Sequence, residues 1–190
     1  QSIVTGTVFN DVNGNGIQDS GEGGISGLTV TIVKSGGSPL ITTTLGNGSY
    51  ELTVPSPPGT YTISSEVPSG FSATTLTSRE ISLVAGDSFS LNFGFQEQGV
   101  ITGSVFNDVN GNGAQDLNES GLSGVTVTLK DSGGTTITST ETVSDGSFSF
   151  GSRDAGSYII DATQPSGFIA TTSTSTSVVV PAGGSANAQF

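Results

Sequence analysis

The chain has 190 residues and a formal net charge of −12, because sixteen acidic residues stand against only four basic ones. This balance argues against nucleic acid and against an anionic membrane surface, since both attract basic faces. The absence of Cys and His excludes disulfide bonds, a thiol nucleophile and the commonest general base, so we expect no enzyme activity. No stretch is apolar for long enough to insert into a membrane.

Short β-strands separated by turn signals are predicted along the first half of the chain. Apolar residues alternate with Thr between 28 and 32, a pattern typical of a half-buried strand. The same alternation marks 89–95, and Gly46-Asn47-Gly48 predicts a turn. No segment has a helical period. The predicted strands are 3–9, 28–32, 40–45, 50–54, one that opens at 61, one that contains 81–83, and 89–95.

The second half of the chain repeats this plan. Val125, Val127 and Leu129 match the strand at 28–32, and the turn that begins at Pro68 returns 97 residues later at Pro165. The repeat predicts two domains, 1–97 and 98–190, each a β-sandwich module. Seven short strands without helices predict an all-β fold of two tandem seven-stranded sandwiches.

A twelve-residue loop between the first two predicted strands has the pattern of a calcium loop. Residues 11–22 fit the template D-x-[DN]-x-[DN]-G-x5-E at every defined position. Calcium takes six to eight oxygen ligands, and this spacing presents them at positions 1, 3, 5, 7, 9 and 12. Gly16 occupies position 6, where the chain turns sharply. The predicted ligands are Asp11, Asn13, Asn15, the Ile17 carbonyl, Asp19 and Glu22.

The same template returns at residues 108–119, again 97 residues later. Its predicted ligands are Asp108, Asn110, Asn112, the Ala114 carbonyl, Asp116 and Glu119. The alternative is a pair of Gly/Asn-rich turns with scattered acidic residues. The Glu at position 12, kept in both copies while its neighbours differ, favours metal binding, with at least one Ca²⁺ per module. An EF-hand has helices beside its loop, whereas both flanks here are β-rich.

The strand–loop–strand segment resembles a known family. The run 6–16, with Glu22 and Gly24-Ile25-Ser26-Gly27, resembles the B-type domain of serine-aspartate repeat surface proteins. The resemblance covers both modules and implies calcium-binding, Ig-like, Greek-key sandwiches of the Cna B type. It also implies an extracellular location, at a cell surface or in a secreted filament. Related pilin-type modules carry a Lys–Asn isopeptide bond, with the Lys on the first strand. Neither first strand here contains Lys, so we expect calcium to take the place of that bond.

These features favour a calcium-stabilised spacer or stalk of an extracellular surface protein. The predicted linker 96–99 is short, so we expect the modules to form a rigid rod, with the loop at 11–22 beside the junction. The alternatives are an adhesin module that binds a host or matrix ligand, and a subunit of a homopolymeric fibre joined by strand addition. Recognition surfaces are usually rich in aromatic residues and Arg, and this chain has 7% aromatic residues. The expected partners are neighbouring identical modules or subunits.

Overall fold

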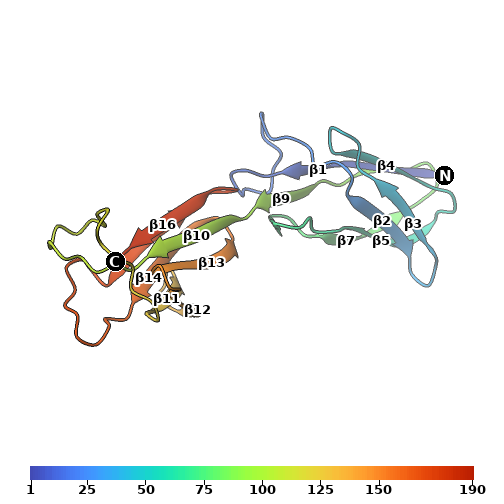
Figure 1. Cartoon of the computed structure of the whole chain (residues 1–190). Coiled ribbons are helices and arrows are strands. Elements are labelled where there is room, and N and C mark those ends of the chain that lie inside the picture. Colours follow the sequence, from blue (N-terminus) through green and yellow to red (C-terminus); the bar gives the residue numbers. More distant parts are fainter. The chain divides into compact units, whose positions relative to one another are not determined.

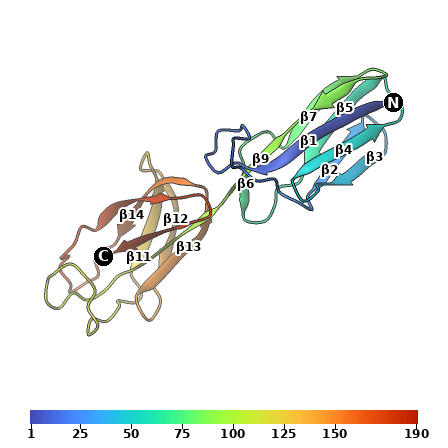
Figure 2. The same cartoon turned by 90° about the horizontal axis from the view of Figure 1, so that it is seen from above.

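The computed structural model describes all residues, Gln1–Phe190, and divides into two units, Gln1–Glu97 (unit 1) and Gln98–Phe190 (unit 2). Both units consist of strands, turns and loops without a helix, as Figures 1 and 2 show. Each unit contains two sheets. The prediction of an all-β chain with two sandwich modules is therefore confirmed. No helix capable of crossing a membrane is present.

In unit 1 the alternating apolar residues of two sheets face each other. One sheet has the order β4-β1-β9-β6, with β8 also pairing with β1, and the other has the order β3-β2-β5-β7. The strands are β1 (Ser2–Asn10), β2 (Thr29–Lys34), β3 (Pro39–Thr43), β4 (Ser49–Val54), β5 (Gly59–Ser65), β6 (Phe71–Ala73), β7 (Ser78–Leu83), β8 (Ser88–Ser90) and β9 (Phe93–Glu97).

Unit 2 repeats this arrangement with seven strands. One sheet has the order β13-β10-β16, and the other has the order β12-β11-β14-β15. The strands are β10 (Gly99–Ser104), β11 (Thr126–Asp131), β12 (Thr136–Glu141), β13 (Ser147–Arg153), β14 (Gly156–Ala162), β15 (Ser175–Val180) and β16 (Ser185–Gln189).

Unit 1 departs from the predicted seven strands in two places. The strand predicted at 89–95 is divided into β8 and β9, which pair in parallel with successive parts of β1. The Asn92 side chain accepts the Thr7 N–H at 2.9 Å across the interruption. In addition, residues Phe71–Ala73, for which the sequence pattern predicts no strand, form the short strand β6 against β9. The linker is also shorter than expected, since β9 ends at Glu97 and β10 begins at Gly99.

Each unit has its own hydrophobic core between its sheets. In unit 1 the largest fully buried side chains include Phe93, Phe95 and Ile63, and in unit 2 they include Ile101, Leu129 and Ile160. These residues occupy the alternate positions that the period-two pattern of each strand predicts. The cores do not merge, because their buried clusters share no residue.

A buried Thr fastens the start of the second strand in both units. The Thr44 hydroxyl donates to the Ile25 carbonyl at 2.7 Å and accepts the Leu28 N–H at 3.0 Å. Thr142 makes the same two bonds, to the Leu122 carbonyl at 2.6 Å and from the Val125 N–H at 2.9 Å. Thr44 and Thr142 are only 5% and 4% exposed, so the backbone groups they satisfy have little access to water.

We predict that Thr44→Val, which keeps the shape of the side chain and removes its hydroxyl, lowers the free energy of unfolding of unit 1 by about 2 kcal/mol, because two buried backbone groups lose their partner. Urea unfolding followed by the fluorescence of Tyr residues would measure the loss. Thr43→Val is the matched control, because Thr43 is the exposed last residue of β3, directly before Thr44 in the chain. Equal stability of the two variants would contradict the prediction.

Candidate metal centre

The two predicted calcium loops begin and end at equivalent positions of the two sandwiches. Loop 1 (residues 11–22) begins where β1 ends, and its neck is closed by a bridge between Phe9 and Gly24 and by the Asn10 N–H, which donates to the Gly23 carbonyl at 2.8 Å. Loop 2 (residues 108–119) has the same neck, with a bridge between Phe106 and Gly121. Gly24 is required there, since an added Cβ would lie 1.9 Å from the Asn47 carbonyl oxygen.

The first position of loop 1 is fixed by backbone N–H groups of the same loop. The Asp11 carboxylate accepts the Asn15 N–H at 3.1 Å and the Gly16 N–H at 2.7 Å, and the residue is fully buried. Gly16 has a φ of 76°, in the left-handed region where a side chain is strained. The turn predicted for position 6 of the template is therefore present.

The side chains of the remaining predicted positions converge on Asp19. The amide groups of Asn13 and Asn15 donate to one Asp19 carboxylate oxygen at 2.8 and 2.7 Å. The Glu22 carboxylate accepts the Asp19 N–H at 3.0 Å and the Asn13 N–H at 3.4 Å. Ile17, at position 7, donates its N–H to the Asn15 side-chain oxygen at 2.7 Å. All six predicted residues of loop 1 are thus linked by one hydrogen-bond network.

Loop 2 contains the same network. Asn110 and Asn112 donate to one Asp116 carboxylate oxygen at 2.7 and 2.9 Å. Asp108 accepts N–H groups of its own loop, Glu119 accepts the Asp116 N–H at 3.0 Å, and Ala114 donates to Asn112 at 2.8 Å. The repeated geometry shows that the template, and not the variable residues within it, determines the loop conformation.

Hydrogen bonding lowers the pKa of one carboxyl group in each network. The amide of Asn13, followed by that of Asn15, lowers the pKa of Asp19, against a smaller effect of desolvation. At Asp108, desolvation acts to raise the pKa, but the N–H groups of Gly113, Gly111 and Asn112 and the Thr171 side chain together lower it. Both groups are therefore held as anions.

The donor set fits a hard cation, but the side chains would have to rearrange to surround one. No three acidic residues lie close enough together to hold an ion, and amide nitrogens rather than oxygens face Asp19. A half-turn of each amide would place an oxygen where its nitrogen now lies. That half-turn gives up the bonds that the amide oxygens accept from the Asn15 and Ile17 N–H groups. Calcium binding by these loops stays a prediction.

The structure also reveals contacts of loop 1 that the template does not contain. The Gln96 side chain, on β9, donates to the Val12 carbonyl at 3.0 Å, and the Asp11 N–H donates to the Phe95 carbonyl at 2.8 Å. Within the loops, Gln18 and Gln115 donate to the carbonyls of Glu22 and Glu119, both at 3.3 Å. The exact repetition of this Gln was visible in the sequence, whereas the contacts of β9 depend on the tertiary fold.

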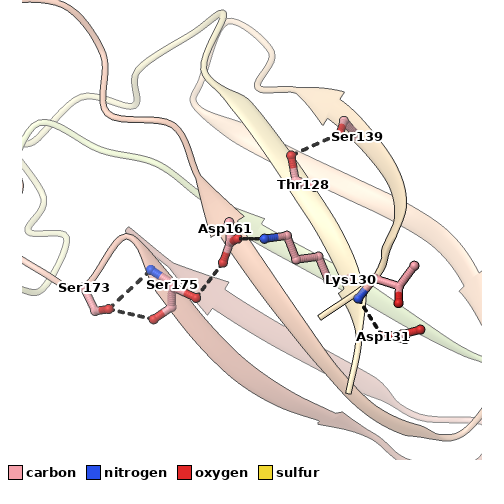
Figure 3. A network of polar contacts seen from close by, with 8 residues as sticks. Thr128, Lys130, Asp131, Ser139, Asp161, Ser173 and Ser175 are labelled. Carbon is pink, nitrogen blue, oxygen red and sulfur yellow. Dashed lines mark hydrogen bonds and ion pairs between the residues drawn. The ribbon is translucent and has the colours of Figure 1, made fainter. Parts of the chain in front are cut away.

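Three acidic residues outside the loops, Glu66, Asp87 and Asp161, have partners of their own. Figure 3 shows Asp161 on the outer face of unit 2, where its carboxylate pairs with the Lys130 ammonium at 2.5 Å and accepts the Ser175 hydroxyl. Glu66 and Asp87 accept the N–H groups of Thr29 and Val84. Lys34 donates to the Pro58 carbonyl at 2.9 Å.

With this geometry established, comparison with known sequences decides the family. A sequence model of the SdrD B-like domain matches residues 3–88 and 99–180. The chain belongs to the SdrD B-like domain family. As an SdrD B-like chain it has the extracellular location that the sequence predicted.

The curated relatives are much longer than this SdrD B-like pair. Serine-aspartate repeat-containing protein F of Staphylococcus epidermidis is 36% identical over 182 residues, which cover 88% of this chain and 11% of that protein. Serine-aspartate repeat-containing protein D of Staphylococcus aureus has the same identity, over 88% of this chain and 14% of its own length. The chain thus spans only a small part of either relative.

Two solved pilin structures align with the chain over most of its length. The minor pilin GBS52 of Streptococcus agalactiae aligns with a TM-score of 0.48 and 12% identity, over 100% of this chain and 94% of that one. The shaft pilin SpaA of Lactobacillus rhamnosus GG aligns with a TM-score of 0.41 and 13% identity, over 99% of this chain and 97% of that one.

We predict that Lys130→Met raises the pKa of Asp161 towards its usual value of 3.8, because the Lys130 side chain is the first cause of its lowering, followed by Ser175. Because the pKa of Asp161 is lower in the folded state than in the unfolded state, its ionisation stabilises the fold at pH values above the unfolded pKa. This stabilisation is lost as the pH falls through the folded-state pKa. The variant should therefore lose about 0.5 kcal/mol at neutral pH and less as pH falls below 3.8.

Carboxyl NMR titration of Asp161 would measure this shift. Lys34→Met is the matched control, since the Lys34 ammonium bonds to a carbonyl and not to a carboxylate. An unchanged Asp161 titration in Lys130→Met would contradict the assignment of the cause.

Proposed function

We propose that the two units are calcium-stabilised spacer modules of an extracellular surface protein or filament. The observation that carries the proposal is the repeated loop network, built from the same six positions and closed by the same neck in both units. An ordinary turn requires only a particular backbone conformation, and its side chains are free to differ. The two loops also share the arrangement of their acidic and amide side chains, which favours a role for those side chains.

The energetics of a small sandwich support a stabilising role for the ion. Each unit has fewer than a hundred residues and no disulfide bond, and domains of this size commonly depend on a disulfide or a metal. An ion that binds only the folded state adds RT ln(1 + [L]/Kd) to the stability, which is about 2.7 kcal/mol when calcium stands at a hundred times Kd. In such a site the carboxylates of Asp11, Asp19 and Glu22 would supply the charge, and the amides of Asn13 and Asn15 would supply neutral oxygens.

The connection between the units supports a spacer whose modules are tightly linked. Only Gln98 separates β9 from β10. Loop 1 is bonded to β9 through Gln96, two residues before that link. An ion that orders loop 1 would therefore also order the last residues of unit 1, and we propose that it limits bending at the junction.

The surface composition supports a spacer over an adhesin. The exposed large apolar side chains are aliphatic, with Phe168 as the single aromatic exception. Binding hot spots are enriched in Trp, Tyr and Arg, whereas this chain has no Trp and only two Arg residues, of which Arg79 alone is exposed. The proposed role is structural and requires no catalysis.

We predict that removing calcium with EDTA lowers the melting temperature of the chain by about 10 °C, since about 2.7 kcal/mol is lost and each kcal/mol corresponds to several degrees in a domain of this size. Differential scanning calorimetry in millimolar calcium and in EDTA would measure the shift. In the double variant Glu22→Gln/Glu119→Gln the shift should disappear, because a ligand carboxylate is lost from each loop.

Glu51→Gln/Glu141→Gln is the control for the loss of two negative charges, since both residues are exposed on strands. The control should keep the full response to calcium. A wild-type melting temperature that does not depend on calcium would disprove the proposed metal sites.

We predict that the junction depends on loop 1 and not on loop 2. Small-angle scattering should therefore show a wider distribution of distances between the units for Glu22→Gln than for Glu119→Gln, at the same calcium concentration and with both units folded. Identical distributions for both variants would contradict the proposed stiffening and would leave the stabilisation of each unit unaffected.

A further inference from the structure

Five Asn residues of the chain are directly followed by Gly. In such a pair the backbone nitrogen of Gly can attack the side-chain carbonyl carbon of Asn, because Gly has no Cβ to hinder the approach. The Asn residues of these pairs are all exposed to water, which the reaction consumes. They are Asn13, Asn15, Asn47, Asn110 and Asn112.

The side-chain carbonyl of each of these Asn residues is held in a conformation that favours the attack. Asn13 Oδ1 accepts the Asn15 N–H at 3.0 Å, and Asn15 Oδ1 accepts the Ile17 N–H at 2.7 Å. Asn47 forms the same turn with the Ser49 N–H at 3.1 Å, and both pairs of loop 2 form it as well. Such an Asx turn folds the side chain back over the following peptide group, and its N–H would stabilise negative charge on the attacked carbonyl oxygen. The side chains therefore do not distinguish the five pairs.

The backbone nitrogens that would attack do differ in their hydrogen bonds. The Gly16 N–H donates to the buried Asp11 carboxylate at 2.7 Å. The Gly48 N–H donates to the Leu45 carbonyl at 2.8 Å, and Gly48 is itself buried. The Gly14 N–H has only the Asp11 carbonyl oxygen, at 3.3 Å, which is longer than the usual N–H···O distance of about 2.7–3.2 Å.

This difference in hydrogen bonding decides which pair can react. The nitrogen attacks only after its N–H has left its acceptor and lost its proton. A strong bond to a carboxylate opposes both steps, because it has to be broken first and because the nitrogen would become negative beside an existing negative charge. In loop 2 both Gly N–H groups donate to the Asp108 carboxylate, at 2.7 and 2.9 Å. The Gly14 nitrogen of loop 1 is the least restrained of the five.

We infer that Asn13 is a site of spontaneous deamidation, which changes loop 1 as the protein ages. The Gly14 nitrogen bonds to the side-chain carbonyl carbon of Asn13, the N–H proton passes to water, and the side-chain amide leaves as ammonia. The product is a cyclic succinimide. Water then opens the ring, at the new bond to give Asp or at the original peptide bond to give isoaspartate. In sum water is consumed and ammonia is released, without oxidation or reduction.

Both products change loop 1 at the third position of its template. The Asn13 amide donates to the Asp19 carboxylate at 2.8 Å, and an Asp at this position would replace that bond by repulsion between two carboxylates. The template accepts Asp there, so this product raises the negative charge of the loop. Isoaspartate adds a carbon to the main chain and shifts every later position. The inference does not rest on calcium binding, because contacts within the chain carry it.

The experiment incubates the whole folded chain at neutral pH in EDTA, so that the outcome does not depend on whether the loops bind calcium. Peptide mapping by mass spectrometry at successive times measures the conversion of each Asn. Asn13 should convert at least about tenfold faster than Asn15 and Asn47, the factor that corresponds to one strong hydrogen bond.

The same chain in concentrated urea is the matched control. All five Asn residues precede Gly, so they should convert at similar rates once the fold is lost. A preference for Asn13 that persists in urea would come from the local sequence and not from the fold. That result, or equal rates for Asn13 and Asn15 in the folded chain, would overturn the inference.

Two variants assign the reaction to its residue. Asn13→Gln should abolish the early mass change of the intact folded chain, because the longer side chain has to close a larger ring. Asn15→Gln makes the same substitution two positions later and should keep the early mass change. The opposite pattern would overturn the inference.

Hydrogen exchange tests the assigned cause without a covalent change. The Gly14 amide should exchange at least about tenfold faster than the Gly16 amide, since only the latter is held by a carboxylate. Equal exchange of the two amides would show that the difference in hydrogen bonding does not select Asn13, and it would overturn the inference.

Discussion

The parallel pairing of the first and last strands determines the position of everything else in each unit. In unit 1 it joins β1 to β8 and β9, and in unit 2 it joins β10 to β16. The pairing brings the end of the first strand, where the acidic loop begins, beside the end of the last strand. The loop is consequently supported by a segment more than eighty residues away, through the bond from the Asp11 N–H to the Phe95 carbonyl.

Polar contacts stabilise this fold at positions where other sandwiches have larger apolar side chains. Close approach at Gly6 is one case, since an added Cβ would lie 1.8 Å from the Leu91 carbonyl oxygen, to which the buried Tyr50 hydroxyl donates. The buried Thr44 and Thr142 are another, because each satisfies two backbone groups. Such contacts are specific to one register, so a Ser-, Thr- and Gly-rich sequence can still define a single fold.

The sequence reveals those features that depend on local pattern. Alternation locates most strands, and the template positions of residues 11–22 predict the turn at Gly16 and the grouping of the loop side chains. Tertiary features are not visible in this way. Nothing local distinguishes Thr44 from Thr42 and Thr43, and residues 71–73 form a strand only because β9 lies beside them. The direction of the Asn13 and Asn15 amides depends on which neighbours compete for their atoms, which a spacing pattern does not contain.

The negative charge of the two loops has to be balanced by other groups. None of the six loop carboxylates forms an ion pair, and the chain has only four basic residues that could neutralise them. Lys130 is held by Asp161, and Lys34 by a backbone carbonyl. The negative charge is therefore balanced by N–H dipoles of the loops or by a cation from solution. Because a buried carboxylate is stabilised less by water than an exposed one, Asp11 stands to gain more from a cation than Asp108. On this reasoning loop 1, which β9 covers, is the stronger of the two proposed sites.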